Sequence, residues 1–288
     1  MIRRAYVLAF SALVGLCFPS RAIGREPSLK DVLARLETYL AAYEGDLATL
    51  VAEEQYEQWV QPKSGDPSTP HRTITSEFGF LRLPGRMEWL GLRDTYAVDG
   101  EPVPDHQRGR LDRMLSGGRS NSDDLARRIV EENARYNLGV VERTINVPML
   151  ALDVLGRRNQ WRLSLRKNRE EQLEGRVAWV VTFSERERPS LVKTPQGRDR
   201  PVRGTVWIDP ADGAVLRTDL EFDGAKADDS PASTITVRYQ RESALGLWVP
   251  SEMREVYRTD SAAGPEEIDA VARYSNFRQF RTTARILP

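Results

Sequence analysis

The fold is decided by the stretch VWIDPADGAVLR at residues 206–217. Pro210 sets φ for the first position of a turn, and Gly213 can adopt the left-handed conformation that a bulged hairpin requires. The residues on either side, 202–208 and 214–222, are rich in β-branched and aromatic side chains, which are typical of strands. The stretch therefore predicts a β-hairpin.

Short runs of similar composition lie on both sides of this hairpin, and Gly, Pro or charged residues bound each of them. Such runs are typical of successive antiparallel strands. Asp99-Gly100 can supply the positive φ of a tight turn between two of them. We expect further strands at 51–60, 77–83, 87–98, 160–165, 177–183, 234–239, 247–257 and 268–281. Two polar stretches are predicted to be loops, 62–70 and the long, highly charged 185–203, which we expect to be mobile.

Helices are predicted before the strands and between them. Ser28 and Asp31 have the spacing of a capping box, apolar residues follow at helical spacing from 29 to 43, and Gly45 offers a left-handed stop. Ser122, with the acidic residues that follow it, can cap a second helix. The helices expected in the middle of the chain span 105–114, 122–136 and 148–155.

This order of elements, together with the hairpin, resembles a known group of exported proteins. The stretch 206–217 is similar to the W-[IL]-D-P-x-[TD]-G-x-x-x-[KR] hairpin of the LolA, LolB and LppX-like periplasmic lipoprotein carriers, and 96–100 and 247–250 add to the likeness. The resemblance implies an α+β fold: a curved antiparallel half-barrel sheet with helices packed on its concave face. The extra helices at 105–137 and the loop at 185–203 depart from the carriers and leave the cargo undecided.

The N-terminus has the layout of a secretory signal peptide. Arg3 and Arg4 precede an apolar run at 5–18, and the small residues Ala22 and Gly24 follow it. The run is too short for a permanent transmembrane helix, and no other stretch is long and uncharged enough. We therefore expect a signal peptide at 1–24, a single half-barrel domain at 25–288, and a periplasmic or secreted protein with no transmembrane segment.

Composition excludes several classes of function. The chain has 42 basic and 42 acidic residues, and the signal peptide removes only three arginines and no acids. A nearly neutral mature chain has no basic excess for nucleic acid. The only cysteine, Cys17, leaves with the signal peptide, so disulfides, cysteine-zinc sites and a cysteine nucleophile are excluded. Its neighbour Leu16 is not the small residue that lipid attachment at Cys17 would require.

No catalytic or metal-binding constellation is recognisable. His71 and His106 are isolated from each other and from any ligand spacing, and no Gly-x-Ser-x-Gly motif is present. Asp209 and Asp212 resemble an acid pair, but aspartates in a tight turn are more often caps of backbone amides. The pair at 123–124 is explained in the same way by a helix start rather than by calcium. We predict no enzyme, no cofactor and no metal.

Large apolar side chains alternate along several of the expected strands, so that each strand sends them to one face. Such faces form either an ordinary core beneath the helices, which is the commoner case, or the wall of a ligand cavity. The candidate residues for an apolar cavity are Phe78, Phe80, Trp161, Leu163, Trp179 and Val181.

Three functions remain open, and the resemblance orders them. The leading hypothesis is a non-catalytic envelope protein that binds or carries an apolar ligand, a lipid or a lipoprotein acyl chain. The second is an interaction module whose cavity is filled by its own side chains and which meets an envelope protein through the sheet surface and 185–203. The third is an envelope hydrolase with an unrecognised acid pair, which two carboxylates converging in a cavity would support.

Overall fold

A computed structural model describes residues 26–279 of the chain, apart from 62–68, 87, 105–108, 110–112, 114–120, 140, 142, 144, 195, 225–229 and 262–263. The expected signal peptide, most of the expected helix at 105–114 and His106 therefore lie outside the described residues. Within the described part of the chain, no helix has the length and apolar character needed to cross a membrane.

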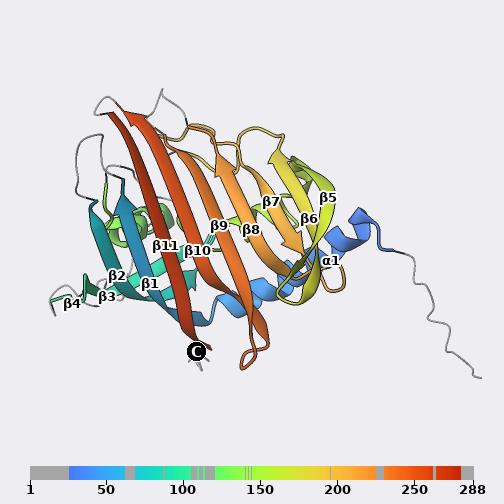
Figure 1. Ribbon diagram of the computed structural model, residues 1–288, viewed down its shortest axis with the longest axis horizontal. Coiled ribbons are helices and arrows are strands. Elements are labelled where there is room, and N and C mark those ends of the chain that lie inside the picture. The colour runs from blue at the N-terminus through green and yellow to red at the C-terminus, as the bar shows by residue number, and fades with distance from the viewer. Residues whose placement is uncertain are drawn as a thin grey trace, which may run out of the picture.

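A single open sheet of eleven strands forms the body of the protein (Figure 1). Every neighbouring pair is antiparallel, and the order is β4-β3-β2-β1-β11-β10-β9-β8-β7-β6-β5. The strands are β1 (Leu50–Val60), β2 (His71–Leu81), β3 (Leu90–Val98), β4 (Glu101–Pro102), β5 (Leu163–Leu173), β6 (Arg176–Glu185), β7 (Arg203–Ile208), β8 (Val215–Phe222), β9 (Ala232–Glu242), β10 (Leu247–Ser261) and β11 (Gly264–Gln279). The curved, open α+β half-barrel is thus as expected.

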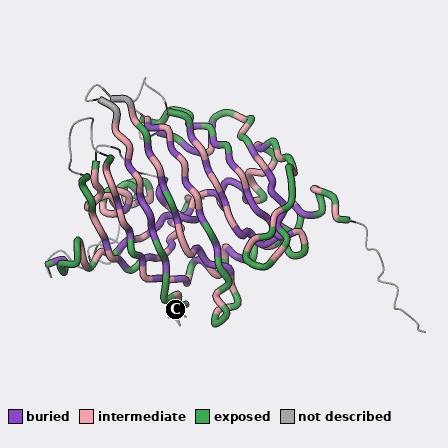
Figure 2. Tube along the Cα trace, in the orientation of Figure 1, coloured by how far each residue is buried: buried purple, intermediate pink, exposed green. Residues whose placement is uncertain are grey.

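Alternation along the strands sets the two faces of the sheet. In β8, Leu216, Thr218 and Leu220 are buried, whereas Arg217 and Asp219 between them are partly exposed. Figure 2 shows the same alternation of buried and less buried residues along most of the strands. One face therefore forms the core, and the other carries the charges.

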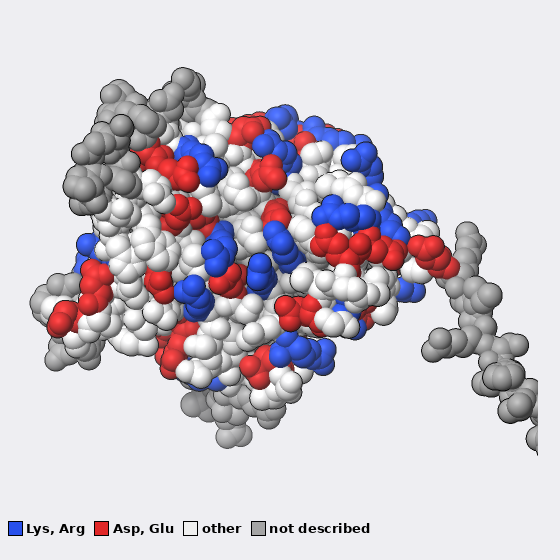
Figure 3. Space-filling view, in the orientation of Figure 1, with Lys and Arg blue, Asp and Glu red and all other residues white. Residues whose placement is uncertain are grey.

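The outward face holds basic and acidic side chains side by side (Figure 3). Arg217 pairs with Asp219 at 2.9 Å, and Arg273 pairs with Glu57 at the same distance. Because both signs are interleaved, this face presents no single charged field that would attract a polyanion. Exposed pairs of this kind contribute little to stability.

Helix α1 (Leu29–Leu47) lies across the inward face of the sheet (Figure 1). The capping box is present, since Ser28 Oγ accepts from the Asp31 amide at 3.2 Å and the Asp31 carboxylate accepts from the Ser28 amide at 2.8 Å. The expected stop at Gly45 is wrong. The helix continues to Leu47 because Tyr43 and Leu47, on either side of the glycine, are both buried against the core.

Shorter helices follow, with boundaries that differ from the sequence expectation. Helix α3 (Ser122–Ala134) is capped by Asn121, whose side chain accepts from the Asp123 amide, while the Ser122 hydroxyl donates to the Pro84 carbonyl at 2.8 Å. Helix α4 (Leu150–Leu155) follows, and then a short 3-10 turn, η2 (Gln160–Arg162). The expected strand at 160–165 therefore begins only at Leu163.

The charged stretch 185–203 is irregular, as expected, yet its side chains tie it to the sheet. Arg200 is buried and donates to Ser233 Oγ on β9 at 2.8 Å and to the Pro231 carbonyl at 2.7 Å. Glu185 accepts from the Leu191 amide at 2.7 Å. These bonds hold the stretch along the ends of β6, β7 and β9.

The β7–β8 turn, which identified the hairpin, docks on α1. Gly213 has φ +79°, and a Cβ atom there would lie 2.5 Å from Arg35 O and from Leu36 N. Arg35 donates to the carbonyl of Pro210 in the same turn. Glycine is therefore required twice at this position, once for the turn and once for the contact with the helix backbone.

Candidate functional site

Five of the six residues predicted to line an apolar cavity are buried in one continuous core. Their exposed fractions are 1% for Phe78, 6% for Phe80, 4% for Leu163, 3% for Trp179 and 0% for Val181. Phe78 and Phe80 pack edge to face with ring centroids 5.1 Å apart. Burial on the inward face thus follows the predicted alternation.

The sixth residue, Trp161, lies elsewhere. It belongs to the 3-10 turn η2 rather than to β5, and 63% of it is exposed. Its indole donates to the Arg158 carbonyl at 2.8 Å, which satisfies its only polar atom within the turn. The expected alternation of Trp161 with Leu163 fails because the strand has not yet begun at position 161.

The buried candidates do not gather at one site. Phe78 lies on β2 and Trp179 on β6, and the sheet places β1, β11, β10, β9, β8 and β7 between these strands. Each group packs into its own end of the core. Sequence reasoning found the inward face correctly but could not tell which inward residues border open space.

A second group of inward residues, the buried arginine network, is polar. It comprises Glu54, Tyr56 and Gln58 of β1, Arg93 of β3, Arg143, and Glu255 and Tyr257 of β10. Arg93 donates to both carboxylate oxygens of Glu54, at 2.6 and 3.0 Å, and Arg143 donates to the Tyr56 hydroxyl at 3.0 Å and to Gln58. These hydrogen bonds tie β1 both to β3 and to the segment that carries Arg143.

Small residues on β11 make room for these side chains. Ala270 lies opposite both Gln58 on β1 and Glu255 on β10, and Ala272 lies opposite Tyr56. A bulky residue at either position would occupy the space above the sheet that the long polar side chains fill. The alternation of small and large inward residues thus favours the network.

Burial and charge decide the protonation of the network. Burial alone would lower the pKa of Arg93, but the charge and the hydrogen bonds of Glu54 outweigh burial and raise it. Burial raises the pKa of Glu255, although Arg143 and the 2.6 Å hydrogen bond from Tyr257 oppose the rise. Glu255 Oε1 has no hydrogen-bond partner among the described residues. The two carboxylates are therefore each engaged by a neighbouring donor or cation rather than by each other.

The aspartates of the β7–β8 turn are caps, as expected. Asp209 accepts from the Ala211 amide at 2.7 Å, and Asp212 accepts from the Ala214 amide at 3.0 Å. Arg176 pairs with both, at 2.9 Å in the case of Asp212. Among the residues with described positions, no group of His, Cys, Asp and Glu side chains could hold a metal ion. His71 opens β2 and stacks on Trp59 with centroids 5.2 Å apart, instead of lying in a loop.

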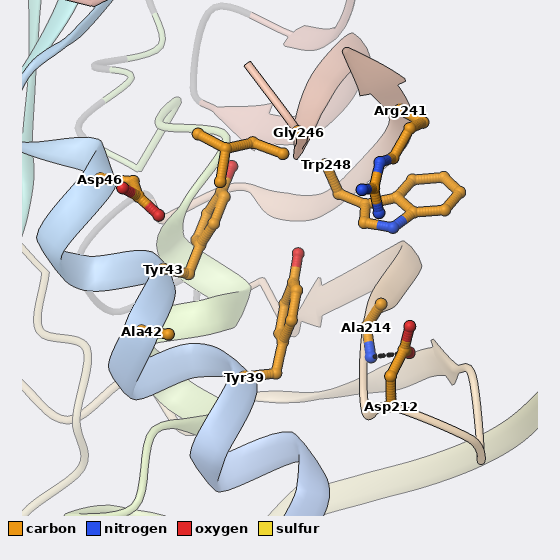
Figure 4. Close-up of a pocket in the computed structure, with 10 residues that line it drawn as sticks. Tyr39, Ala42, Tyr43, Asp46, Asp212, Ala214, Arg241, Gly246 and Trp248 are labelled. Carbon is orange, nitrogen blue, oxygen red and sulfur yellow. Dashed lines mark hydrogen bonds between the residues drawn. The ribbon is translucent and has the colours of Figure 1, made fainter. Parts of the chain in front are cut away.

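An open pocket, the helix pocket, lies between α1 and the neighbouring ends of β8, β9 and β10 (Figure 4). Its volume is about 230 Å³. Tyr39 and Tyr43 form one wall and stack with centroids 5.6 Å apart and ring planes 13° apart. The pocket is lined by Tyr39, Ala42, Tyr43 and Asp46 of α1, Asp212 and Ala214 of the β7–β8 turn, and Arg241, Gly246, Leu247 and Trp248 of the β9–β10 hairpin.

The walls of the helix pocket combine rings with polar atoms that have no internal partner. Tyr43 and Trp248 are only 3% and 6% exposed, and neither Tyr43 Oη nor Trp248 Nε1 has a hydrogen-bond partner among the described residues. Burial raises the pKa of Tyr43, and the nearby Tyr39, Tyr239 and Asp46 raise it further. The Tyr43 hydroxyl therefore stays protonated and can donate.

Sequence reasoning missed both the buried arginine network and the helix pocket. A signal for the network was present, because Glu54 and Gln58 occupy positions of β1 that alternate with Tyr56 and must face inward once the strand is recognised. The pocket had no comparable signal. Its wall joins α1 to two hairpins that are distant in sequence, and only the docking of the β7–β8 turn on the helix brings them together.

Comparison with solved structures finds likenesses of fold across most of the chain. A domain described as an outer membrane lipoprotein-sorting protein, from Vibrio parahaemolyticus, is 12% identical with a TM-score of 0.36, over 87% of this chain and 95% of that one. A DUF1329 family protein from Desulfovibrio piger is 10% identical with a TM-score of 0.34, over 88% and 95%. A LolA superfamily protein from Nitrosomonas europaea is 11% identical with a TM-score of 0.31, over 90% and 96%.

The group that the hairpin resembles is therefore found among the structures to which this chain is similar. No protein-family model matches the chain, and no curated protein does so either. With identities and TM-scores this low, none of these likenesses decides what the chain binds.

Proposed function

We propose that this chain is an exported, non-catalytic binding protein that holds an apolar ligand, a lipid or an acyl chain, in the helix pocket. The observation that carries the proposal is the wall of Tyr39, Tyr43 and Trp248 around an opening of about 230 Å³. Small-molecule sites combine such apolar and aromatic walls with a few polar groups that fix orientation. The helix pocket has both.

The size of the pocket limits the ligand. Sites for drug-sized molecules measure roughly 300–1,000 Å³, and the helix pocket, at about 230 Å³, is smaller. It therefore suits one end of a single chain better than a whole lipid. The exposed residues Ala42 and Gly246 at its rim leave an opening through which the rest of a ligand can extend.

A non-catalytic role is supported by how the inward acids are engaged. Arg93 binds both oxygens of Glu54, and Tyr257 donates to Glu255. A glycosidase-type pair needs two carboxylates that face each other across the substrate. Neither of these acids lines the helix pocket, and of the two acids that do, Asp46 and Asp212, the second is engaged by Arg176 and by the Ala214 amide rather than facing the first.

Filling the pocket tests the proposal. Ala42 lies on the exposed side of α1 and borders the opening, so Ala42→Trp should place an indole in it without disturbing the core. Ala41→Trp adds the same side chain at an exposed neighbouring position that does not line the pocket. We expect the parent and Ala41→Trp to bind the neutral fluorescent probe N-phenyl-1-naphthylamine equally, and Ala42→Trp to bind it at least about tenfold more weakly. Equal binding by the two variants would refute the pocket as the site.

Export is proposed from the signal-peptide layout, with residues 25–288 as a single mature domain. N-terminal sequencing of the protein recovered from the periplasm or medium should begin at Ile23 or Arg25. A protein retained with an intact Met1, or acylated at Cys17, would contradict both the location and the cleavage.

A second candidate is an interaction module of the envelope whose interior is filled by its own side chains. The observation in its favour is the burial of Phe78, Leu163, Trp179 and their neighbours in one continuous core. This function predicts no uptake of apolar probes by the parent protein, and an envelope protein bound instead at the sheet surface or at 185–203. Probe binding that Ala42→Trp abolishes would exclude it.

A further inference from the structure

Two hydrogen-bond donors in the walls of the helix pocket, one on α1 and one on β10, have no acceptor. Trp248 Nε1 and Tyr43 Oη are buried and have no partner among the described residues. An indole N–H can only donate, so an acceptor must come from a ligand or from water. Leaving such a group unsatisfied is energetically unfavourable. The pocket therefore favours a ligand that brings an oxygen acceptor to the indole.

A cation stands beside the indole. Arg241 lies directly opposite Trp248 in the pairing of β9 with β10, and Figure 4 shows its guanidinium next to the indole. Arg241 makes no hydrogen bond or ion pair with another described residue, whereas the nearby Arg176 is engaged by Asp209 and Asp212. An arginine remains charged at any physiological pH. The acceptor favoured here is thus an anionic oxygen group.

The remaining charges limit that anion to a single negative charge. Asp212 is occupied by Arg176 and by the Ala214 amide, but Asp46 has no ion pair within the described structure and lies on the other side of the pocket from Arg241 (Figure 4). A dianion such as phosphate would meet one unpaired cation and one unpaired acid. A carboxylate placed at Arg241 satisfies the cation and stays away from Asp46.

The stacked rings indicate what the carboxylate is attached to. Tyr39 and Tyr43 present flat apolar surface between the Arg241 end and the Asp46 end of the pocket (Figure 4). Aliphatic carbon packs on such faces, whereas a fully polar small molecule would leave them without a complementary surface. We propose that the helix pocket binds the carboxylate end of a single fatty acid, with Trp248 and Arg241 holding the carboxylate and the rings of Tyr39 and Tyr43 holding the first carbons. This inference rests on the proposed function and names its ligand class.

Competition for the neutral probe tests the inference on the full mature chain. The competitors are decanoate, decanol, which has the same chain without the charge, and propionate, which has the same carboxylate without the chain. We expect decanoate to displace the probe at about a tenfold lower concentration than either, since one hydrogen bond to a charged group corresponds to tenfold or more in affinity.

Two variants remove the polar groups that hold the carboxylate. Trp248→Phe and Arg241→Gln should each lower the preference for decanoate over decanol severalfold while decanol binding stays unchanged. Matched controls on the exposed surface are Arg238→Gln, on the same strand as Arg241, and Trp161→Phe. Urea unfolding of each variant shows whether it is folded, and Trp248→Phe should lose some stability because it also removes buried ring surface.

The outcomes separate this inference from the proposed function. Equal displacement by decanoate and decanol would overturn the carboxylate assignment and leave an apolar pocket in place. Propionate as effective as decanoate would overturn the fatty acid and indicate a small free carboxylate. If neither the probe nor decanoate binds the parent protein, the proposed function fails and the inference fails with it.

Discussion

Replacing Gly213 by alanine should weaken the contact between the β7–β8 turn and helix α1 and so destabilise the fold. The glycine has φ +79°, and an added Cβ would lie 2.5 Å from the backbone of Arg35 and Leu36. Backbone atoms of a helix cannot rotate aside as a side chain can, so either the turn or the whole helix must move. The same turn contributes Asp212 and Ala214 to the helix pocket.

The magnitude follows from two contributions. A non-glycine residue in the left-handed region costs roughly 1–2 kcal/mol, and forcing an extra carbon into a close-packed contact costs about 1–3 kcal/mol more. We therefore expect Gly213→Ala to lower the free energy of unfolding by about 2–5 kcal/mol. Gly175→Ala is the matched control, because Gly175 also lies in a hairpin turn with positive φ, +73°, but a Cβ there has no atom within 4 Å. It should cost only the backbone contribution.

Urea unfolding of the parent and both variants measures the difference, and probe binding reports on the pocket. Gly213→Ala should be clearly less stable than Gly175→Ala and should bind the probe more weakly, while Gly175→Ala binds it as the parent does. If the two variants lose the same stability, the turn does not dock on the helix as described.

Three further predictions concern the interior. Arg93→Met leaves Glu54 buried without its cation and should cost about 3–5 kcal/mol in urea unfolding, and adding Glu54→Gln should recover much of this loss; an unchanged double mutant would contradict the pairing. Trp179→Ala should cost about 3–5 kcal/mol if its surroundings are closely packed, and a much smaller loss in a urea melt, with altered probe uptake, would show that Trp179 borders a ligand cavity. Burial raises the pKa of Asp153 from 3.8 to about 6 despite the hydrogen bond from the Trp89 amide. The folded state therefore binds the Asp153 proton more tightly than the unfolded state does. This tighter binding stabilises the fold fully below about pH 4, and the stabilisation is lost as the pH rises to 6. At 1.36 kcal/mol per pH unit the loss is about 3 kcal/mol, and unfolding at pH 4 and 7 should show this decline in the parent but not in Asp153→Asn.

Local chemistry in the sequence predicted most of the elements. The turn at 209–213 and the capping box of Ser28 are fixed by residues within a few positions, and both are present. Predicted element boundaries were wrong where tertiary contacts outweighed the local signal. Gly45 stays helical because Tyr43 and Leu47 are both buried, and β5 begins three residues later than predicted because η2 precedes it.

The site was harder to predict because it depends on contacts between distant segments. Alternation placed Trp179 and Phe78 on the inward face correctly, but their positions at opposite ends of the sheet follow from the strand order, which the sequence pattern does not contain. Arg143 could not be assigned to the buried network either, since it lies outside any strand or helix and faces β1 only through the fold.

The pairing of β1 with β11 has a consequence for synthesis and folding. The two strands meet in the interior of the sheet, and their contacting residues, such as Glu53 and Asn276, are 223 positions apart. Closing so long a segment is entropically unfavourable and slows folding. Until the last strand arrives, β1 and β10 each present a free edge on which other chains can add. A chain of this topology therefore folds only once it is complete, and a premature stop before β11 leaves two half-sheets prone to aggregation rather than a smaller functional domain.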